Sequence, residues 1–294
     1  MNHDTTPHAG PDQVRGGRQG PVVAGVDGSA PARTALLWAA AEAERHGRPL
    51  RIVHAAGTDD QRAREAGHTL LGESADLVAE GFPGLAVTQE FSPEDAVPAL
   101  RDAAGTDGTI VVGSRGLGGF GELLLGSVGL GVAAHARVPV VVVRGETERP
   151  VSGRVVAGVR GRNDLDWLRP AARAAQVRGA ALHLLTVWTP LAHVGTAGTL
   201  LDDIDGVAAR HVHEMRVLAD AIGAEFPGLT VTTEVEGGRS VAELLVQATH
   251  DAELLVLGAH HPPLGIGRAI GHVTHAVLHH AHCPVEIVPR AHTD

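Results

Sequence analysis

The sequence predicts an α/β protein made of two similar halves, each a five-stranded parallel sheet covered by helices on both faces. Short apolar, β-branched runs alternate along the chain with longer Ala- and Leu-rich segments. This alternation favours strands joined by helices into a parallel sheet. The same succession of segments then occurs a second time, and repetition at domain length indicates duplication of a whole domain.

Matching segments make the duplication visible. The first half begins with VVAGVDGS at residue 22, and the second half begins with VVAGVRGR at residue 155. Both halves contain FPGL and end in a strand that begins with Pro-Val. We therefore expect domains at 21–145 and 154–290, a polar seam containing Pro150 between them, and a disordered tail over 1–20.

Each half follows the order β-α-β-α-β-α-β-α-β. In the first half the patterns predict strands near 22–26, 50–55, 85–90, 109–113 and 139–144, and helices over 31–46, 62–81, 94–104 and 127–136. The terminal strands, 140–143 and 285–288, are expected at sheet edges, where an exposed apolar edge invites pairing. We therefore expect the halves to pack through these strands as a pseudo-dimer.

Composition excludes several classes of function. All 24 basic residues are Arg, which excludes the P-loop, with its phosphate-binding lysine, and Schiff-base chemistry. Cys283 is the only cysteine, so an internal disulfide is impossible, and the net charge of −10 argues against a nucleic-acid partner. No apolar stretch approaches the ~20 residues that span a bilayer. We expect a cytoplasmic protein with no membrane partner.

A glycine-rich segment follows the fourth predicted strand. Gly113 and Gly116 come directly after the strand, and Gly126 and Ser127 begin a helix after the stretch 117–125. Glycines let main-chain amides approach phosphate oxygens, and the amino end of a helix favours an anion. Ser127 adds a hydroxyl donor. In a parallel sheet ligands bind at the carboxyl ends of the strands, so the segment predicts a phosphate site.

This spacing, G-x2-G-x9-G-[ST] before a helix and a CPV-like strand, resembles the ATP-binding signature of the universal stress protein family. Gly113, Gly116, Gly126 and Ser127 match the signature position by position, and the resemblance covers 21–289 in two copies. It implies two tandem Rossmann-like domains of the adenine-nucleotide-binding type.

The resemblance also implies a function for the first half. Asp27 matches the family's acidic pocket residue and would contact the nucleotide or its Mg²⁺, with the adenine held near Ala55. A helix-capping role for Asp27 beside Ser29 is the alternative. The implied function is an ATP-binding regulator of the stress response, with ATP and Mg²⁺ as cofactors. Ordering of loop 114–125 around the phosphates would change the surface shown to an unidentified protein partner, and the chain is expected to form a homodimer.

The second half has lost parts of the motif. Gly258 and Gly271 are retained, but His261 replaces the second glycine, His272 replaces the hydroxyl residue and Arg160 replaces the acid. Two hypotheses stay open. In the first, the second half binds no ATP and has a structural or interaction role. In the second, Arg160 with His261 or His272 holds an anion directly, without a metal.

No catalytic residue is predicted. GxSxG, HExxH and CxxC motifs are absent, and Ser127, His54 and Arg115 are interpreted as pocket or loop residues. Two alternatives to the regulator stay open: a slow ATP hydrolase or other nucleotide-using enzyme on the same fold, and an interaction scaffold that binds no nucleotide.

Two further patterns are rejected as sites. The GxGxxG at 116–121 follows the fourth strand instead of the first and lacks an acidic residue about 20 positions later, so it predicts no NAD site. His272, His275 and His279 share one predicted helix face, but no Asp, Glu or Cys joins them at ligand spacing. We therefore predict no metal site on protein ligands alone.

Overall fold

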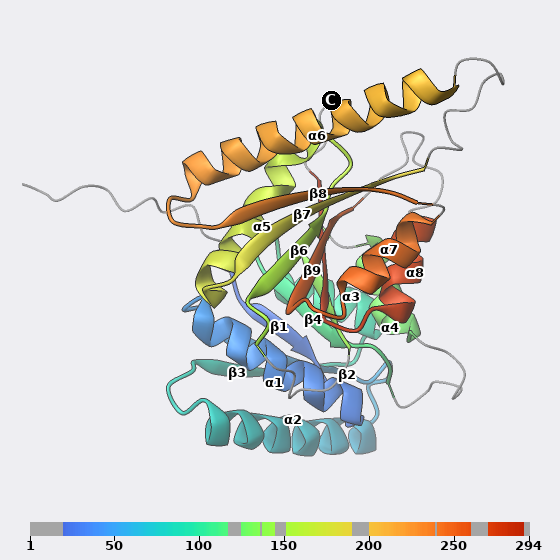
Figure 1. Ribbon diagram of the computed structural model, residues 1–294. Helices are drawn as coiled ribbons and strands as arrows, with labels where there is room; N and C mark the ends of the chain where they lie inside the picture. The colour runs from blue at the N-terminus through green and yellow to red at the C-terminus, as the bar shows by residue number, and fades with distance from the viewer. Residues whose placement is uncertain are drawn as a thin grey trace, which may run out of the picture.

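The computed structural model describes residues 20–116, 125–135, 137–144, 151–189, 200–238, 240–259 and 270–290. Within these ranges ten strands form one continuous sheet of order β3-β2-β1-β4-β5-β10-β9-β6-β7-β8 (Figure 1). The first half consists of β1 (Val22–Gly25), α1 (Ala30–Arg45), β2 (Leu50–Ala55), α2 (Gln61–Gly81), β3 (Val87–Ser92), α3 (Ala96–Ala104), β4 (Thr109–Gly113), α4 (Ser127–His135) and β5 (Val140–Val143). The second half consists of β6 (Arg154–Gly158), the 3-10 helix η1 (Arg162–Asp164), α5 (Leu165–Arg178), β7 (Ala181–Trp188), α6 (Leu200–Glu225), β8 (Val231–Gly237), α7 (Val241–Ala248), β9 (Leu254–Gly258), α8 (His272–His280) and β10 (Val285–Val288).

Within each half all neighbouring strands are parallel, as the sequence predicts. The halves join where β5 and β10 pair antiparallel, with Val142 opposite Val285. Each terminal strand is the edge of its own half and lies in the middle of the complete sheet. The expected pseudo-dimer through these strands is confirmed.

One predicted strand is displaced by two residues. The third strand was expected over 85–90 and begins at Val87. Leu85 donates its N–H to the Phe82 carbonyl at 3.1 Å and so closes a turn, which keeps the chain from extending until after Ala86.

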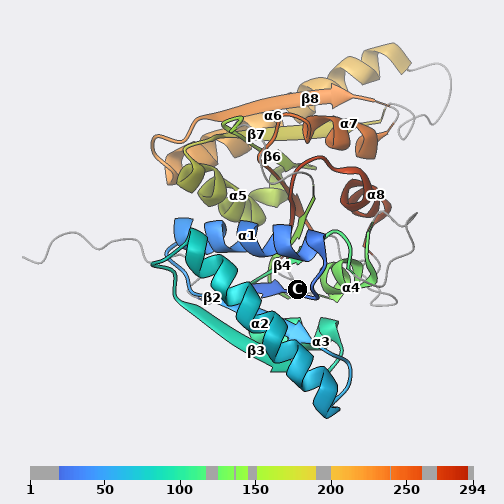
Figure 2. The same cartoon turned by 90° about the horizontal axis from the view of Figure 1, so that it is seen from below.

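Helices cover both faces of the sheet (Figure 2). On one face, α1 and α2 bury a cluster that includes Leu36, Ile52 and Leu71. On the other face, a cluster with Leu100 and Val132 from the first half continues to Val277 in the second half. This apolar layer crosses the β5–β10 junction, so the two halves share the core on this face of the sheet.

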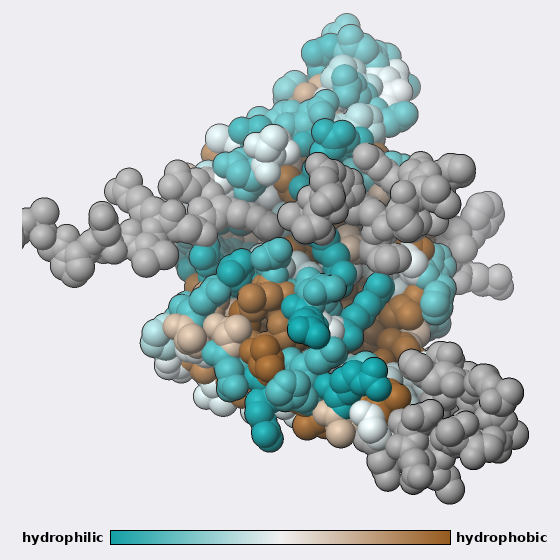
Figure 3. Space-filling model, turned by 90° about the horizontal axis from the view of Figure 1, so that it is seen from above, coloured by the Kyte–Doolittle hydropathy of each residue, from teal (hydrophilic) through white to brown (hydrophobic). Residues whose placement is uncertain are grey.

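The described surface is mixed in polarity. The face shown in Figure 3 has limited groups of apolar residues among hydrophilic ones. Among the helices described, none combines the length and the apolar composition of a membrane-spanning segment.

Candidate functional site

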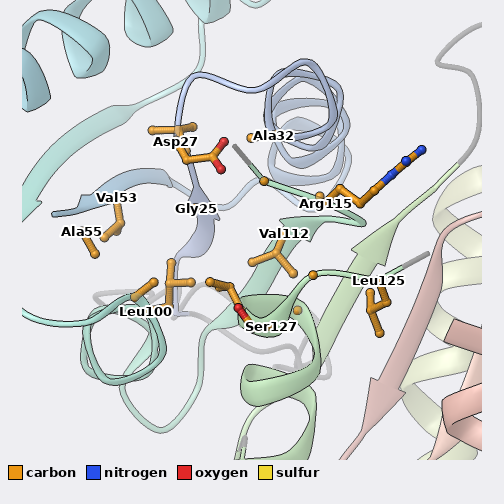
Figure 4. A pocket seen from close by; sticks show the side chains of 17 residues that line it. Gly25, Asp27, Ala32, Val53, Ala55, Leu100, Val112, Arg115, Leu125 and Ser127 are labelled. Carbon is orange, nitrogen blue, oxygen red and sulfur yellow. The ribbon is translucent and has the colours of Figure 1, made fainter. Parts of the chain in front are cut away.

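A cavity of about 400 Å³ lies at the carboxyl ends of the first-half strands (Figure 4). Strand order in this half is β3-β2-β1-β4-β5, so the order reverses between β1 and β4, where ligands bind in open parallel sheets. All six residues predicted from the sequence line this one cavity: Asp27, Ala55, Gly113, Gly116, Gly126 and Ser127. The structure thus brings together residues from four separate segments of the chain.

The loop after β1 is held by its own side chains. The Asp27 Oδ1 atom accepts the Ser29 N–H at 3.0 Å. The Ser29 hydroxyl oxygen in turn accepts the Ala32 N–H at 3.3 Å and so caps α1. Because Ser29 provides the cap, the capping role considered for Asp27 is wrong. The Asp27 carboxylate instead lies on the cavity wall (Figure 4).

Two glycines of the motif are required for different reasons. A Cβ at Gly116 would collide with the Asp27 carboxylate, so the absence of a side chain there keeps the acid and the glycine loop close together. A Cβ at Gly113 would come within 2.7 Å of the Pro31 carbonyl. Gly113 therefore also serves the packing of β4 against the start of α1, a structural role that the motif alone did not indicate.

The start of α4 presents main-chain donors to the cavity. Gly126 donates its own N–H to the Ser114 carbonyl at 2.8 Å and thereby closes the loop. The first intrahelical bond runs from the Leu130 N–H to the Gly126 carbonyl at 3.1 Å. The helix therefore leaves the amides of residues 127–129 for an outside acceptor, and all three residues line the cavity.

The remaining wall is apolar, and the sequence motifs did not reveal it. Ala96 and Leu100 of α3 line the cavity beside Val53 and Ala55 of β2. Leu100 is 2% exposed and belongs to the apolar face of α3, a helical pattern that does not by itself distinguish a cavity wall from ordinary core. The cavity thus has an apolar side near Ala55 and a polar side near Asp27 and α4.

Arg115 and His54, interpreted from the sequence as pocket or loop residues, lie in different positions relative to the cavity. Arg115 lines the cavity, but its side chain extends away from Asp27 and Ser127 in Figure 4. The His54 Nδ1 atom lies 2.8 Å from the Val26 carbonyl, so His54 ties the end of β2 to the end of β1. His54 is not among the residues that line the cavity. Residues 117–124, which contain most of the predicted ordering loop and of the GxGxxG pattern, lie outside the described residues.

After β9, the second half repeats the main-chain hydrogen bond that follows β4 in the first half. Ala259 donates its N–H to the Val288 carbonyl at 2.7 Å, as Ser114 does to Val143 at 3.1 Å. A Cβ on Gly258 would come within 2.7 Å of the Trp167 indole nitrogen. A tryptophan side chain of α5 therefore fills space beside Gly258, whereas the first half has main chain beside Gly113.

The histidines of the second half do not form a cluster of metal ligands in the described ranges. The His275 and His279 rings lie 4.3 Å apart between centroids, and no group of three or more His, Cys, Asp or Glu side chains with ligand geometry occurs among the residues described. His261, a further residue of the predicted metal-free anion site, lies outside those residues.

Fold and site together define an α/β protein with a glycine-lined cavity at the switch point of a doubly wound parallel sheet. Comparison with known proteins identifies the family. The model of the universal stress protein family matches residues 20–144 and 153–289. The chain therefore belongs to the universal stress protein family, in a tandem arrangement.

Individual relatives agree with this assignment. A universal stress protein of Mycolicibacterium smegmatis is 29% identical over 290 residues, which cover 91% of this chain and 96% of that protein. One from Mycobacterium tuberculosis is 29% identical over 289 residues, covering 90% and 94%. The crystal structure of a universal stress protein from Archaeoglobus fulgidus shares the fold, with a TM-score of 0.67, 18% identity and coverage of 92% and 98%.

Proposed function

We propose that the first half binds ATP with Mg²⁺ and that the chain acts as a nucleotide-dependent regulator of the stress response. The observation that supports this proposal most directly is the cavity at the β1–β4 switch point, where main-chain donors, one hydroxyl and one carboxylate line a space that is otherwise apolar. Its volume of about 400 Å³ lies within the range of small-molecule sites, about 300–1,000 Å³.

The residues present suit a nucleotide with its phosphates toward α4. The amides of residues 127–129 and the Ser127 hydroxyl would donate to phosphate oxygens, and the helix dipole acts in the same direction. The apolar wall formed by Val53, Ala55 and Leu100 would bury one face of the adenine ring. Hydrogen-bond donors and apolar side chains thus line the same cavity, which suits a ligand with one apolar end and one charged end.

Asp27 supports the proposed magnesium ion. Mg²⁺ takes oxygen ligands, commonly one or two carboxylates together with substrate phosphates. Asp27 is a lining carboxylate in the cavity, and when bound the ion would neutralise phosphate charge beside it. Without a cation, the carboxylate would repel the triphosphate.

For the second half we favour the hypothesis that it binds no ATP. Trp167 is 3% exposed and packs against Gly258, where the nucleotide cavity lies in the first half. Arg160 stands where Asp27 stands in the first half and would repel a magnesium ion. The proposal therefore predicts one nucleotide per chain. A cytoplasmic location and a homodimer are expected for such a regulator.

Calorimetric titration and thermal unfolding with Mg-ATP test the proposal. A ligand at 100 times its Kd adds about 2.7 kcal/mol to the unfolding free energy, which raises the Tm of a chain of this size by several degrees. In Gly116→Asp, the new carboxylate collides with Asp27 and repels phosphate, so binding is lost. Gly84→Asp is the control, because Gly84 is exposed and a Cβ there meets nothing within 4 Å.

The outcomes separate the proposed function from its rivals. An unchanged Tm and no heat of binding for the parent protein would favour the nucleotide-free scaffold. ATP turnover above a slow background, abolished by Asp27→Asn, would favour the enzyme. A stoichiometry of two nucleotides per chain would contradict the proposed closure of the second half.

A further inference from the structure

Three polar side chains form a hydrogen-bonded row at the edge of the sheet in the second half. The His183 Nδ1 atom lies 2.8 Å from the Thr232 hydroxyl oxygen, and the His183 Nε2 atom lies 2.7 Å from a carboxylate oxygen of Glu234. His183 belongs to β7, and the other two residues belong to β8, the neighbouring edge strand (Figure 1). A hydroxyl, an imidazole and a carboxylate in this order are the parts of an activated nucleophile with its base and its orienting acid.

The hydrogen-bond partners determine which nitrogen of a neutral His183 ring carries the proton. An ionised carboxylate can only accept, so Nε2–H donates to Glu234 and Nδ1 is left to accept the Thr232 O–H. Burial lowers the pKa of His183, the hydrogen bond to Glu234 raises it, and the charge of Arg154 lowers it, so that the pKa lies below the usual 6.5. The imidazole is therefore neutral at pH 7, as a general base must be.

The Glu234 carboxylate is held in its charged form. The hydrogen bond from His183 lowers its pKa, burial raises it, and the hydrogen bond from Glu236 and the charge of Arg154, 3.8 Å away, lower it further. Glu236 shows the opposite shift, because its hydrogen bond with Glu234 raises the pKa of Glu236. Glu234 thus keeps a negative charge and can stabilise the imidazolium that forms when His183 takes a proton.

The hydroxyl is open to solvent, whereas its base is shielded. Thr232 is exposed, and His183 is 8% exposed. Val231 and Val235 of β8 pack against the core cluster to which α6 contributes, and successive residues of a strand face opposite sides of the sheet. Thr232 and Glu234 therefore face away from α6, where a small molecule can reach the hydroxyl.

The first half has the same strand pairing without a base. Thr88, which is also exposed, lies opposite Arg51, as Thr232 lies opposite His183. Arg51 pairs with Glu90 at 3.5 Å, so a cation already suffices for the contact with the carboxylate. A guanidinium stays protonated and cannot accept a hydroxyl proton. The two halves thus contain a version of the arrangement with a base and a version without one.

We propose that Thr232 is an acylation site that accepts one acyl group from an activated acyl ester, with His183 as the general base and Glu234 as a positioning residue. The Thr232 oxygen forms a bond to the carbonyl carbon of the ester while its proton passes to His183 Nδ1. The bond from that carbon to the leaving oxygen then breaks, and the leaving oxygen takes the electron pair and the proton from His183. The products are O-acyl-threonine and the free alcohol. The site lies in the second half and does not depend on the proposed ATP site.

Incubation of the full chain with p-nitrophenyl acetate, without nucleotide, tests the proposal. Absorbance follows the release of p-nitrophenol, and peptide mass spectrometry locates the acetyl group. The chain has no lysine, which removes the usual amine acceptor of acetyl groups. General-base catalysis contributes about 10²–10⁴-fold, so we expect acetylation of Thr232 and roughly 100-fold less, or lower still, on Thr88.

The pH dependence separates a base from a structural ion pair. Acetylation requires the neutral form of His183, so its rate should rise with pH and have a midpoint below 6.5, the usual pKa of histidine. Glu234→Gln removes the charge that raises the pKa of His183, so the midpoint should move to lower pH and the rate should fall. Arg154→Met removes a charge that lowers this pKa, so the midpoint should move to higher pH.

Substitutions test the nucleophile and the base directly. Thr232→Val should abolish acetylation at this position, and His183→Gln should slow it by roughly 100-fold or more. Thr88→Val is the matched control, because Thr88 occupies the same register position opposite Arg51, and it should leave the rate on Thr232 unchanged. Circular dichroism checks that each variant is folded.

Any of three results would overturn the proposal. Equal acetylation of Thr232 and Thr88 would show that His183 does not activate the hydroxyl. A rate on Thr232 that stays constant across the titration of histidine would exclude His183 as the base, and this result decides the question even if His183→Gln does not fold. Release of p-nitrophenol without an acetyl group on Thr232 would assign the reaction to other side chains. Mg-ATP binding is measured separately, so failure of the ATP proposal remains distinguishable.

Discussion

Glu42 and Arg178 form a buried ion pair between the two halves, on helices α1 and α5, which lie side by side in Figure 2. The Arg178 Nη2 atom donates to Glu42 Oε2 at 2.5 Å, and the side chains are 3% and 10% exposed, Arg178 first. His46 and Arg45 also contact the Glu42 carboxylate, at 2.9 and 3.4 Å. The Arg178 guanidinium carbon lies 5.8 Å from the ring centroid of Trp38. The pair therefore links the α1 and α5 layers electrostatically.

Replacing Glu42 by Gln tests the energetic weight of this pair. Burial alone raises the pKa of Glu42, but the hydrogen bond from His46 and the charge of Arg178 outweigh burial and hold the pKa at about 2, against 4.5 for an unperturbed glutamate. This difference corresponds to about 3 kcal/mol of unfolding free energy at neutral pH. Because the Glu42→Gln substitution would leave Arg178 buried without a carboxylate, we expect a total loss of about 3–5 kcal/mol at pH 7.

The pH dependence gives the sharper result. A carboxyl group whose pKa is lowered in the folded protein stabilises it fully above the unfolded pKa, and the stabilisation is lost as the pH falls toward the folded pKa. For Glu42 that window runs from 4.5 down to about 2. By pH 3 about 2 kcal/mol of the stabilisation should be gone, so the difference between parent and Glu42→Gln should shrink by that amount.

Urea unfolding followed by far-UV circular dichroism at pH 7 and pH 3 measures both quantities. Glu44→Gln is the control, because Glu44 is exposed on the same helix and its replacement should change the unfolding free energy by under about 0.5 kcal/mol. If parent and Glu42→Gln lost the same unfolding free energy between the two pH values, the carboxyl of Glu42 would not have the low pKa on which the reasoning depends.

The remaining predictions concern the frame of the first-half cavity. Gly113→Ala places a methyl group within 2.7 Å of the Pro31 carbonyl, so it should lower the unfolding free energy by about 1–3 kcal/mol. Urea unfolding without nucleotide measures this loss, and an unchanged midpoint would show that β4 and α1 can separate freely. Ser29→Ala removes the hydroxyl that accepts the Ala32 N–H and should lower the unfolding free energy by about 1 kcal/mol. Mg-ATP binding should persist, since the Asp27 carboxylate is unchanged. Loss of binding by calorimetry would instead show that Ser29 contacts the ligand.

Much of the fold could be predicted from the sequence because its strands are short, apolar, β-branched runs and its helices are longer, Ala-rich segments. The apolar strands and the Ala-rich helices were located within about two residues of their observed ends. Strand β3 is displaced by two residues, because the bond from the Leu85 N–H to the Phe82 carbonyl extends the turn before it. A turn hydrogen bond of this kind depends on backbone geometry, so it cannot be predicted from the spacing of apolar residues in the sequence.

The candidate site was predictable to the extent that it consists of glycines and a helix start at fixed spacing. Gly116 and Gly126 were recognisable because glycines at this spacing before a helix are typical of phosphate sites. All six predicted residues line one cavity. Ala96 and Leu100 were missed because an apolar residue that borders a cavity has the same sequence pattern as one in the core. The capping by Ser29 in place of Asp27 depends on side-chain direction, which sequence spacing does not specify.

By itself, then, the sequence determined the duplication, the order of strands and helices in each half, and the glycine motif with its asymmetry between the halves, because these are properties of neighbouring residues. The sequence also indicated that the two terminal strands join the halves. Tertiary structure alone decided that β5 and β10 pair antiparallel, with Val142 opposite Val285, and that Trp167 and Arg290 meet at Gly258. Residues 167, 258 and 290 are far apart in the chain, and only the packing of α5 against the ends of β9 and β10 brings them to one point.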